Sequence, residues 1–176
     1  PTGNTCSEQA YIKPSNTRAN DACGIAVSLS TDGNTLAVGS SGESSVTTGV
    51  NSTPNYDGTA FNTGAVYVFV RTGTTWTEQA YIKASNTGVL DLFGFSLSLS
   101  ADGRTLAVGS LNEDSNTIGI NPIPNDDGAT NDSGAVYVFT RTGSTWPQHA
   151  YIKASNTGAE DRFGYEVSLS ANGNTL

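Results

Sequence analysis

Charged residues are scarce in this chain, and so are the residue types that carry most enzyme and metal chemistry. Only 14% of its 176 residues are charged, and it has one histidine, two cysteines and no methionine. This composition leaves no zinc motif, no Ser/His/Asp set and no phosphate-binding loop. His149 has no matching nucleophile and is interpreted as a surface substitution. We therefore expect no catalytic residue and no enzymatic activity.

Positive charge is particularly sparse. Eight Lys and Arg residues stand against sixteen Asp and Glu residues, for a net charge of -8. Nucleic acid and anionic membranes would be repelled by this surface, so neither is an expected partner. No apolar run approaches the roughly 20 residues of a membrane-spanning helix, which argues against membrane insertion. Cations, proteins and neutral polymers such as glycans remain as ligand classes.

What the chain does have is repetition. The tripeptide Tyr-Ile-Lys begins at Tyr11, Tyr81 and Tyr151, a constant spacing of 70 residues, and Ser-Asn-Thr follows one residue later each time. The hexapeptide Gly-Ala-Val-Tyr-Val-Phe begins at Gly64 and again at Gly134. Repeats of this length are supersecondary units that bury their cores by stacking on neighbours.

Within each repeat the pattern predicts four antiparallel strands and no helix. In the middle repeat large residues alternate with small ones from Phe93 to Ser100, and Asp102-Gly103 supplies a tight hairpin turn. The predicted strands are residues 93–100, 105–109, 134–140 and 146–154. One large and one small face would let successive sheets stack as β-propeller blades. A β-sandwich also explains the alternation but not the 70-residue repeat.

The repeat boundaries divide the chain into an incomplete ring of about two and a half blades within one propeller domain. The expected segments are an outer strand in 1–16, blade repeats in 17–86 and 87–156, and the start of a third repeat in 157–176. Closed propellers need four or more blades. We therefore interpret the sequence as a piece of a longer polypeptide. The alternative is an open assembly whose edge strands pair between chains into a filament.

Together these motifs resemble a known family. Phe93-Gly94 and Phe163-Gly164 open a strand, Gly109-Ser110 closes the next, and Gly-Ala-Val-Tyr-Val-Phe forms the third. In this combination the chain resembles FG-GAP repeats, the blades of the integrin-α-type propeller, in their bacterial form. The resemblance implies an extracellular binding or adhesion role. It departs from the family where Gly-Ser replaces Gly-Ala-Pro and where Cys23-Gly24 replaces Phe-Gly.

The two cysteines stand where other repeats have aromatic residues. Cys6 aligns with Trp76 and Trp146, and Cys23 aligns with Phe93 and Phe163. If Trp and Phe pack against each other within a repeat, the cysteines are neighbours, and we predict a Cys6–Cys23 disulfide. Such a bond would stabilise the chain by about 3 kcal/mol and would imply a secreted or cell-surface location. The alternative is two buried free thiols.

The longest connections, 41–63 and 111–133, are the candidate ligand loops. Their oxygen donors suit calcium. The candidate ligands are Glu43, Asn55, Asp57, Glu113, Asp114, Asn125, Asp126, Asp127 and Asp132. Integrin-type propellers carry calcium on a hairpin that is too short here, at 100–105, so those family ligands do not carry over. The alternative is that these Asn, Asp and Gly residues serve turns.

Two aromatic residues of the first loop, Tyr56 and Phe61, are candidate contacts for a glycan. A residue that recurs in every repeat has a different interpretation. Asp21, Asp91 and Asp161 each precede a Gly by three residues, and we predict that they accept hydrogen bonds from backbone amides. The sequence thus favours a non-enzymatic module that binds protein or glycan. The alternative is a structural subunit of a secreted or surface assembly.

Overall fold

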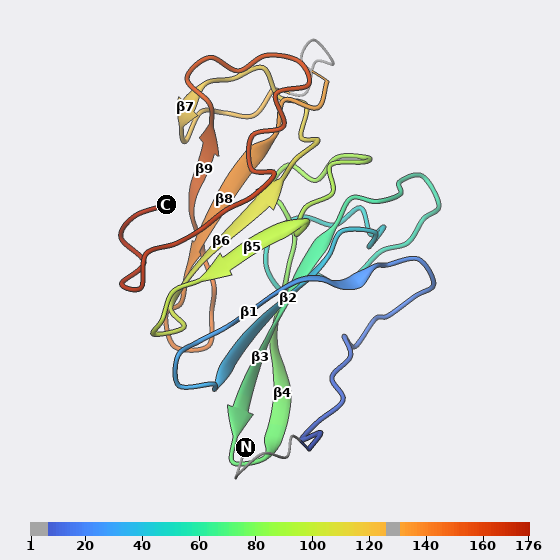
Figure 1. Ribbon diagram of the computed structural model, residues 1–176. Coiled ribbons are helices and arrows are strands. Elements are labelled where there is room, and N and C mark those ends of the chain that lie inside the picture. The colour runs from blue at the N-terminus through green and yellow to red at the C-terminus, as the bar shows by residue number, and fades with distance from the viewer. Residues whose placement is uncertain (1–6, 126–130) are drawn as a thin grey trace.

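The computed structural model describes residues 7–125 and 131–176, and in these residues the fold is all-β (Figure 1). None of the described residues forms a helix long and apolar enough to cross a membrane. The strands are β1 (Cys23–Leu29), β2 (Thr35–Ser40), β3 (Ala65–Thr72), β4 (Thr75–Ile82), β5 (Ser96–Leu99), β6 (Thr105–Ser110), β7 (Gly119–Ile120), β8 (Ala135–Thr140) and β9 (Gln148–Lys153).

The first sheet is a four-stranded meander in the order β1-β2-β3-β4. Gly33, with a φ of 67°, closes the hairpin between β1 and β2, because this angle is one that glycine adopts without steric cost. In the third strand Tyr67 stands opposite Tyr81 of the fourth, and their rings lie 5.4 Å apart. Four antiparallel strands per repeat are therefore confirmed for this sheet.

The second sheet repeats this arrangement and adds one short strand. Its order is β5-β6-β8-β9-β7, in which Gly119 and Ile120 of β7 pair with Lys153 and Ile152 of β9. The equivalent place in the first sheet holds a single bridge between Val50 and Ile82. The extra strand was not predicted, and it forms because the long loop returns along the outer edge of the sheet.

The core lies between the two sheets. The first sheet contributes small and aliphatic side chains such as Ala37, Val68 and Ile82, and the second contributes larger ones such as Tyr137 and Phe139. This is the packing of a large face on a small face that the alternating sequence predicted. The two sheets form an incomplete set of propeller blades and close no ring within the described residues.

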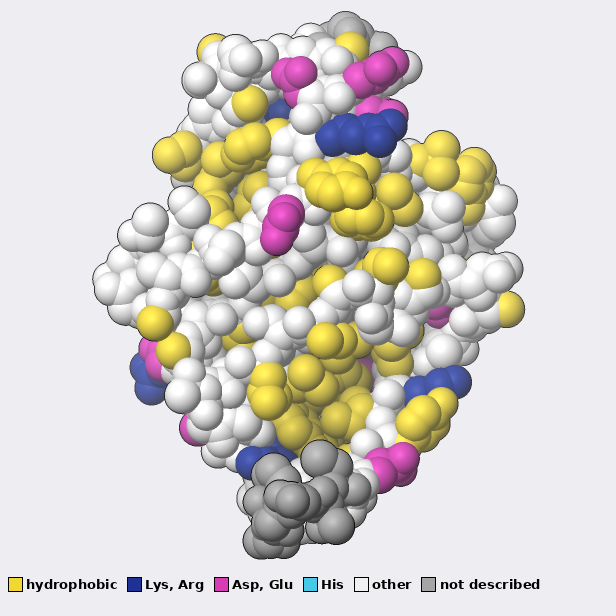
Figure 2. Space-filling model, in the orientation of Figure 1, with side chains coloured by type: hydrophobic (Ala, Val, Ile, Leu, Met, Phe, Trp, Pro, Cys, Tyr) yellow, Lys and Arg dark blue, Asp and Glu magenta, His cyan; other side chains and the backbone are white. Residues whose placement is uncertain are grey.

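The opposite face of the first sheet is only partly covered. It holds a second apolar cluster, in which Tyr67 and Phe69 are buried and Trp76 is half-buried. On β1 the side chains of Val27 and Leu29 are more than half exposed, at 63% and 53%. Figure 2 shows hydrophobic side chains gathered over this lower sheet.

The Phe-Gly dipeptide joins one blade to the next. Phe93 forms a parallel bridge with Gly64 and packs its ring against those of Tyr137 and Phe139, at 5.2 and 6.2 Å. Gly94 follows with a φ of 85°, and a Cβ atom there would meet the carbonyl oxygen of Ala65. Backbone approach this close requires glycine. The first predicted strand of this repeat accordingly begins later than expected, at Ser96.

Candidate functional site

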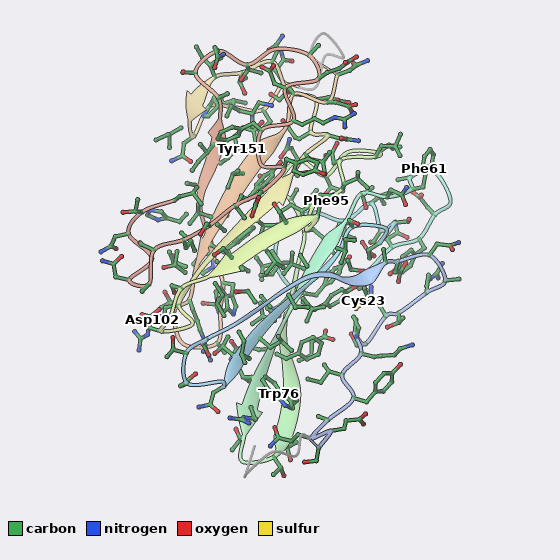
Figure 3. The ribbon with its side chains drawn as sticks, in the orientation of Figure 1. Cys23, Phe61, Trp76, Phe95, Asp102 and Tyr151 are labelled. Carbon is green, nitrogen blue, oxygen red and sulfur yellow. The ribbon has the colours of Figure 1, made fainter. Side chains whose placement is uncertain are left out.

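The two long connections leave their sheets at the end opposite the short hairpins. One runs from Ser40 to Ala65 and the other from Ser110 to Ala135. In Figure 3, Phe61 in the first loop and Asp102 in a short hairpin lie on opposite sides of the molecule. The tips of these loops form the candidate functional site, and their bases contain buried charge.

A buried ion pair anchors the first loop. The Lys83 Nζ atom donates to Glu43 Oε2 at 2.7 Å, to Thr63 Oγ1 at 2.6 Å and to the Gly64 carbonyl at 2.6 Å. Both charged side chains are completely buried. The ammonium group has three N–H donors, and each has an acceptor, which is the condition for burying such a charge. Burial lowers the pKa of Lys83 and the charge of Glu43 opposes that shift.

This arrangement ties both ends of the loop to the outer strand. Glu43 lies near the beginning of the loop, whereas Thr63 and Gly64 lie at its end. The Thr63 hydroxyl also donates to the carbonyls of Glu43 and Ser45, at 3.0 and 2.9 Å. Lys83 directly follows β4. The base of the loop is therefore fixed, whatever the sequence of its tip.

The second loop has the same anchor. Lys153 Nζ donates to Glu113 Oε2 at 2.6 Å and to Ser133 Oγ at 2.7 Å, and both charged side chains are completely buried. Glu113 Oε1 accepts further bonds from the Tyr151 hydroxyl at 2.7 Å and from Asn86 Nδ2 at 2.8 Å. The anchor of this blade therefore includes a residue from the preceding repeat.

That residue is the Asn of the repeated Ser-Asn-Thr. Asn86 Oδ1 accepts a 2.6 Å bond from the Tyr137 hydroxyl, and the equivalent Asn16 accepts one of 2.7 Å from Tyr67. Asn16 Nδ2 donates to the Tyr56 hydroxyl at 2.6 Å rather than to a glutamate. Sequence reasoning missed these contacts and the lysine anchors, although the 70-residue recurrence of Lys and Asn was the signal.

A further pair of asparagines holds the middle of each loop. Asn51, with a φ of 56°, donates its backbone N–H to the Tyr81 carbonyl and accepts the Tyr81 N–H on its side chain, at 2.7 and 3.0 Å. Asn121 and Tyr151 make the same two bonds. These loop residues therefore have a structural role as side-chain partners of the outer strand.

Those candidate calcium ligands that the structure describes are not gathered into one group. Glu43 and Glu113 are buried in the ion pairs. Asp57 Oδ1 accepts from the backbone and hydroxyl of Thr59, at 2.9 and 2.6 Å, and is exposed. Asn55 is exposed and its backbone N–H donates to Ser45 Oγ at 2.7 Å.

In the second loop, Asp114 Oδ1 accepts the backbone N–H of Asp132 at 2.8 Å, and Asn125 N–H donates to Ser115 Oγ at 2.8 Å. Asp126 and Asp127 lie outside the described residues. In the part of the chain that the structure describes, no three His, Cys, Asp or Glu residues are grouped so as to hold a metal ion. Calcium binding stays a prediction, which isothermal titration with calcium tests.

The two aromatic candidates differ in accessibility. The Arg18 guanidinium lies 3.6 Å from the centroid of the Tyr56 ring, so one face of this ring is already occupied. Burial, followed by the nearby Glu43, raises the pKa of Tyr56, which keeps its hydroxyl neutral. Phe61 is 55% exposed and remains open to a ligand.

The predicted disulfide involves one residue outside the described part of the chain. Cys23 is exposed at the start of β1, whereas Cys6 lies outside the described residues. The premise of Trp–Phe packing does not hold in the next repeat, because Trp76 packs with the second apolar cluster and Phe93 with the first. The Cys6–Cys23 bond therefore stays a prediction.

The repeated aspartates do what the sequence predicted. Asp21 accepts the backbone N–H of Arg18 at 2.6 Å, and Asp91 accepts that of Gly88 at 2.8 Å. Asp161 accepts the N–H of Gly158 at 2.8 Å. Their structural role in the turn before the first strand of each repeat is confirmed.

Comparison with known proteins identifies the repeat. Residues 76–139 match the family model described as FG-GAP repeat. This segment runs from β4 of the first sheet to β8 of the second and includes the Phe-Gly dipeptide and the second long loop. No curated protein matches the sequence. The matched segment supports an FG-GAP repeat protein, and the 70-residue recurrence and the blade-like sheets are consistent with it.

Proposed function

We propose that the chain is an extracellular, non-enzymatic module that binds a protein or glycan through the tips of its two long loops. The observation that carries this proposal is the contrast between the bases and the tips. The bases contain completely buried Lys–Glu pairs, whereas Phe61, Ile118 and Ile123 are 55%, 58% and 88% exposed. Large apolar side chains held in water on a rigid base are typical of binding surfaces.

The differences between the loops support recognition rather than a purely structural role. Thr48 and Thr53 in the first loop correspond to Ile118 and Ile123 in the second, and Phe61 corresponds to Asn131. The anchors are the same in both loops, but the exposed residues are not. Variation among exposed loop residues on a shared pair of buried anchors is what separate ligand contacts on one scaffold require.

The extracellular location rests on the FG-GAP repeat and on the predicted disulfide. Alkylation of the natively purified protein with and without reduction tests the latter. Mass added only after reduction supports the bond, whereas alkylation of both thiols without reduction excludes it.

A panel of immobilised glycans and matrix proteins tests the binding function. The first ligand that binds the native protein should bind the double variant Phe61→Ala/Ile123→Ser at least about tenfold more weakly, because two apolar contacts are lost. Ile25→Ser is the matched control, since Ile25 is 50% exposed but belongs to β1 and to neither long loop. No binding across the panel would favour a structural subunit of a surface assembly.

A further inference from the structure

A polar hollow of about 280 Å³ lies at the short-hairpin end of the second sheet, where Arg104, Arg141 and Gly143 line it. Arg104 belongs to the hairpin between β5 and β6, and the other two residues follow β8 in the hairpin that leads to β9. The backbone N–H of Arg141 donates to the carbonyl of Arg104 at 2.7 Å. This backbone bond holds the two arginines next to each other at the hollow.

The hairpin that carries Arg104 is flanked by the corresponding hairpins of the first and third repeats. Thr31 donates its backbone N–H to the Ala101 carbonyl, and Ala101 donates its own to the Ala171 carbonyl, both at 2.9 Å. Arg141 Nη1 reaches Thr35 Oγ1 of the first repeat at 3.4 Å. The hollow therefore lies within the described row of repeats, between neighbours on both sides.

Both guanidinium groups have N–H donors that remain available. Arg141 is half-buried, and it donates from Nε to the Gly143 carbonyl at 3.0 Å as well as from Nη1 to Thr35. Because a guanidinium group has five N–H donors, most of those of Arg141 have no acceptor among the described residues. The side chain of Arg104 is exposed and donates no hydrogen bond within the same part of the chain.

Neither arginine forms an ion pair with a carboxylate in residues 7–125 and 131–176. Asp102 lies in the same hairpin as Arg104, but its Oδ1 atom accepts from the Ser100 hydroxyl at 2.6 Å and from the Arg104 backbone N–H at 3.0 Å. Two positive charges therefore share one hollow without a bonded counter-ion, in a chain whose net charge is -8.

The other repeats show that the fold does not require a second arginine at this place. Asn34 and Asn174 occupy the position of Arg104, and Arg71 occupies that of Arg141. In the first repeat Arg71 Nε donates to Asn34 Oδ1 at 3.2 Å. Arginine in place of this asparagine removes the acceptor and adds a positive charge. An anion between the two guanidinium groups would supply the missing acceptor.

We propose that this hollow binds one sulfate or phosphate monoester group of a small ligand such as a sugar. Planar guanidinium groups donate in pairs to such oxyanions, and the resulting charge-assisted hydrogen bonds are among the strongest in proteins. The hollow is slightly smaller than the usual pocket for a whole ligand, which favours recognition of the charged group alone. The net charge of -8 disfavours a polyanion. The site is separate from the loop tips, so the inference does not depend on the proposed function.

The probes are glucose 6-sulfate, glucose 6-phosphate and unmodified glucose, each titrated into the full chain by isothermal titration calorimetry at low ionic strength. The two anions should bind saturably, and glucose should not bind. The anion that binds more tightly identifies the source of the group. Arg104→Asn should weaken binding at least about tenfold, because charge-assisted hydrogen bonds are lost. The variant restores the residue that the first and third repeats have, so the hairpin should still form.

Arg162→Asn is the matched control, since it removes the same charge from an exposed arginine that lies 3.8 Å from Asp132 in another part of the molecule. This variant should bind both anions as the wild type does. No saturable binding of either anion up to about 50 mM would overturn the proposal, because sites weaker than this contribute little affinity. Equal losses in Arg104→Asn and Arg162→Asn would also overturn it, since they would assign binding to overall charge.

Discussion

The side-chain amide of Asn86 accepts a 2.6 Å hydrogen bond from the hydroxyl of Tyr137, although the two residues belong to successive repeats. Asn86 follows the outer strand of the first sheet, and Tyr137 lies in the middle of the second. The same amide donates to the buried carboxylate of Glu113. One side chain therefore couples the packing of two blades to the anchor of the second long loop.

Replacing Asn86 by alanine should lower the free energy of unfolding by about 1–3 kcal/mol, because a buried hydroxyl and a buried carboxylate each lose a partner. Urea denaturation measures this loss. Asn156→Ala is the matched control, since Asn156 occupies the same place in the next repeat and is exposed. Its effect should stay within about 0.5 kcal/mol. Equal effects of the two variants would show that Asn86 does not couple the blades.

Removing one charge of a loop anchor should be far more costly. Lys83→Met leaves the carboxylate of Glu43 buried without its counter-ion, and we expect a loss of about 3–5 kcal/mol in chemical denaturation. The double variant Lys83→Met/Glu43→Leu should recover much of this loss, because no unpaired charge then remains. A double variant as unstable as the single one would mean that the ion pair contributes through its geometry rather than by mutual neutralisation.

Asp102, in the hairpin between β5 and β6, makes a pH-dependent contribution to the stability of the folded state. The Ser100 hydroxyl, and then the Arg104 backbone N–H, hold the pKa of Asp102 below its ordinary value of 3.8. A carboxylate with a lowered pKa in the folded state contributes stability that is complete above about pH 4 and disappears as the pH falls through the lowered pKa. The contribution is small because the group is largely exposed.

Asp102→Asn should therefore destabilise the protein slightly near neutral pH and by less at about pH 2, as thermal denaturation at both pH values would show. Asparagine can make the same hydrogen bonds, since Asn172 does so in the third repeat with Ser170 and Asn174. Glu8→Gln, at an exposed position before the first strand, is the control. A constant difference between wild type and Asp102→Asn at all pH values would contradict the prediction.

The glycine of the Phe-Gly dipeptide should tolerate no side chain. Gly94→Ala places a Cβ atom against the Ala65 carbonyl at a φ of 85°, and we expect a loss of about 3 kcal/mol or more. Gly73→Ala is the matched control, because Gly73 also has a positive φ, 62°, but has open space around it. That variant should cost about 1 kcal/mol. Similar losses for both would assign the effect to backbone strain alone.

The fold was predictable from the sequence because the same strand and turn motifs recur at a spacing of 70 residues. Alternation around Leu97 and Leu99 identified a strand, and Asp102-Gly103 identified its hairpin, since both are local signals. The large and small faces could also be predicted, because they follow from the same alternation. The short strand β7 could not, since it is created by pairing between a loop and a strand about 30 residues away.

The candidate site was less predictable because the role of a charged residue depends on its partner. In the sequence, Glu43 and Glu113 are of a residue type that binds metal ions. In the fold, each accepts a hydrogen bond from a lysine 40 residues away. Local patterns do not reveal such distant pairs. Asp91, whose partner is a backbone amide three residues away, was predicted correctly for the opposite reason.

Because the buried Lys–Glu pairs hold the bases of the long loops, the loop tips can change in sequence without changing the scaffold. Lys83 and Glu43 fix where the first loop starts and ends, and neither side chain reaches the surface. Substitutions, insertions or a grafted peptide between Ser45 and Thr63 therefore leave the anchor chemistry untouched. A library of variants at Phe61 and its exposed neighbours could therefore be screened for new ligands while the anchored scaffold stays unchanged. The long loop of the second blade has its own anchor and would allow an independent library on the same molecule.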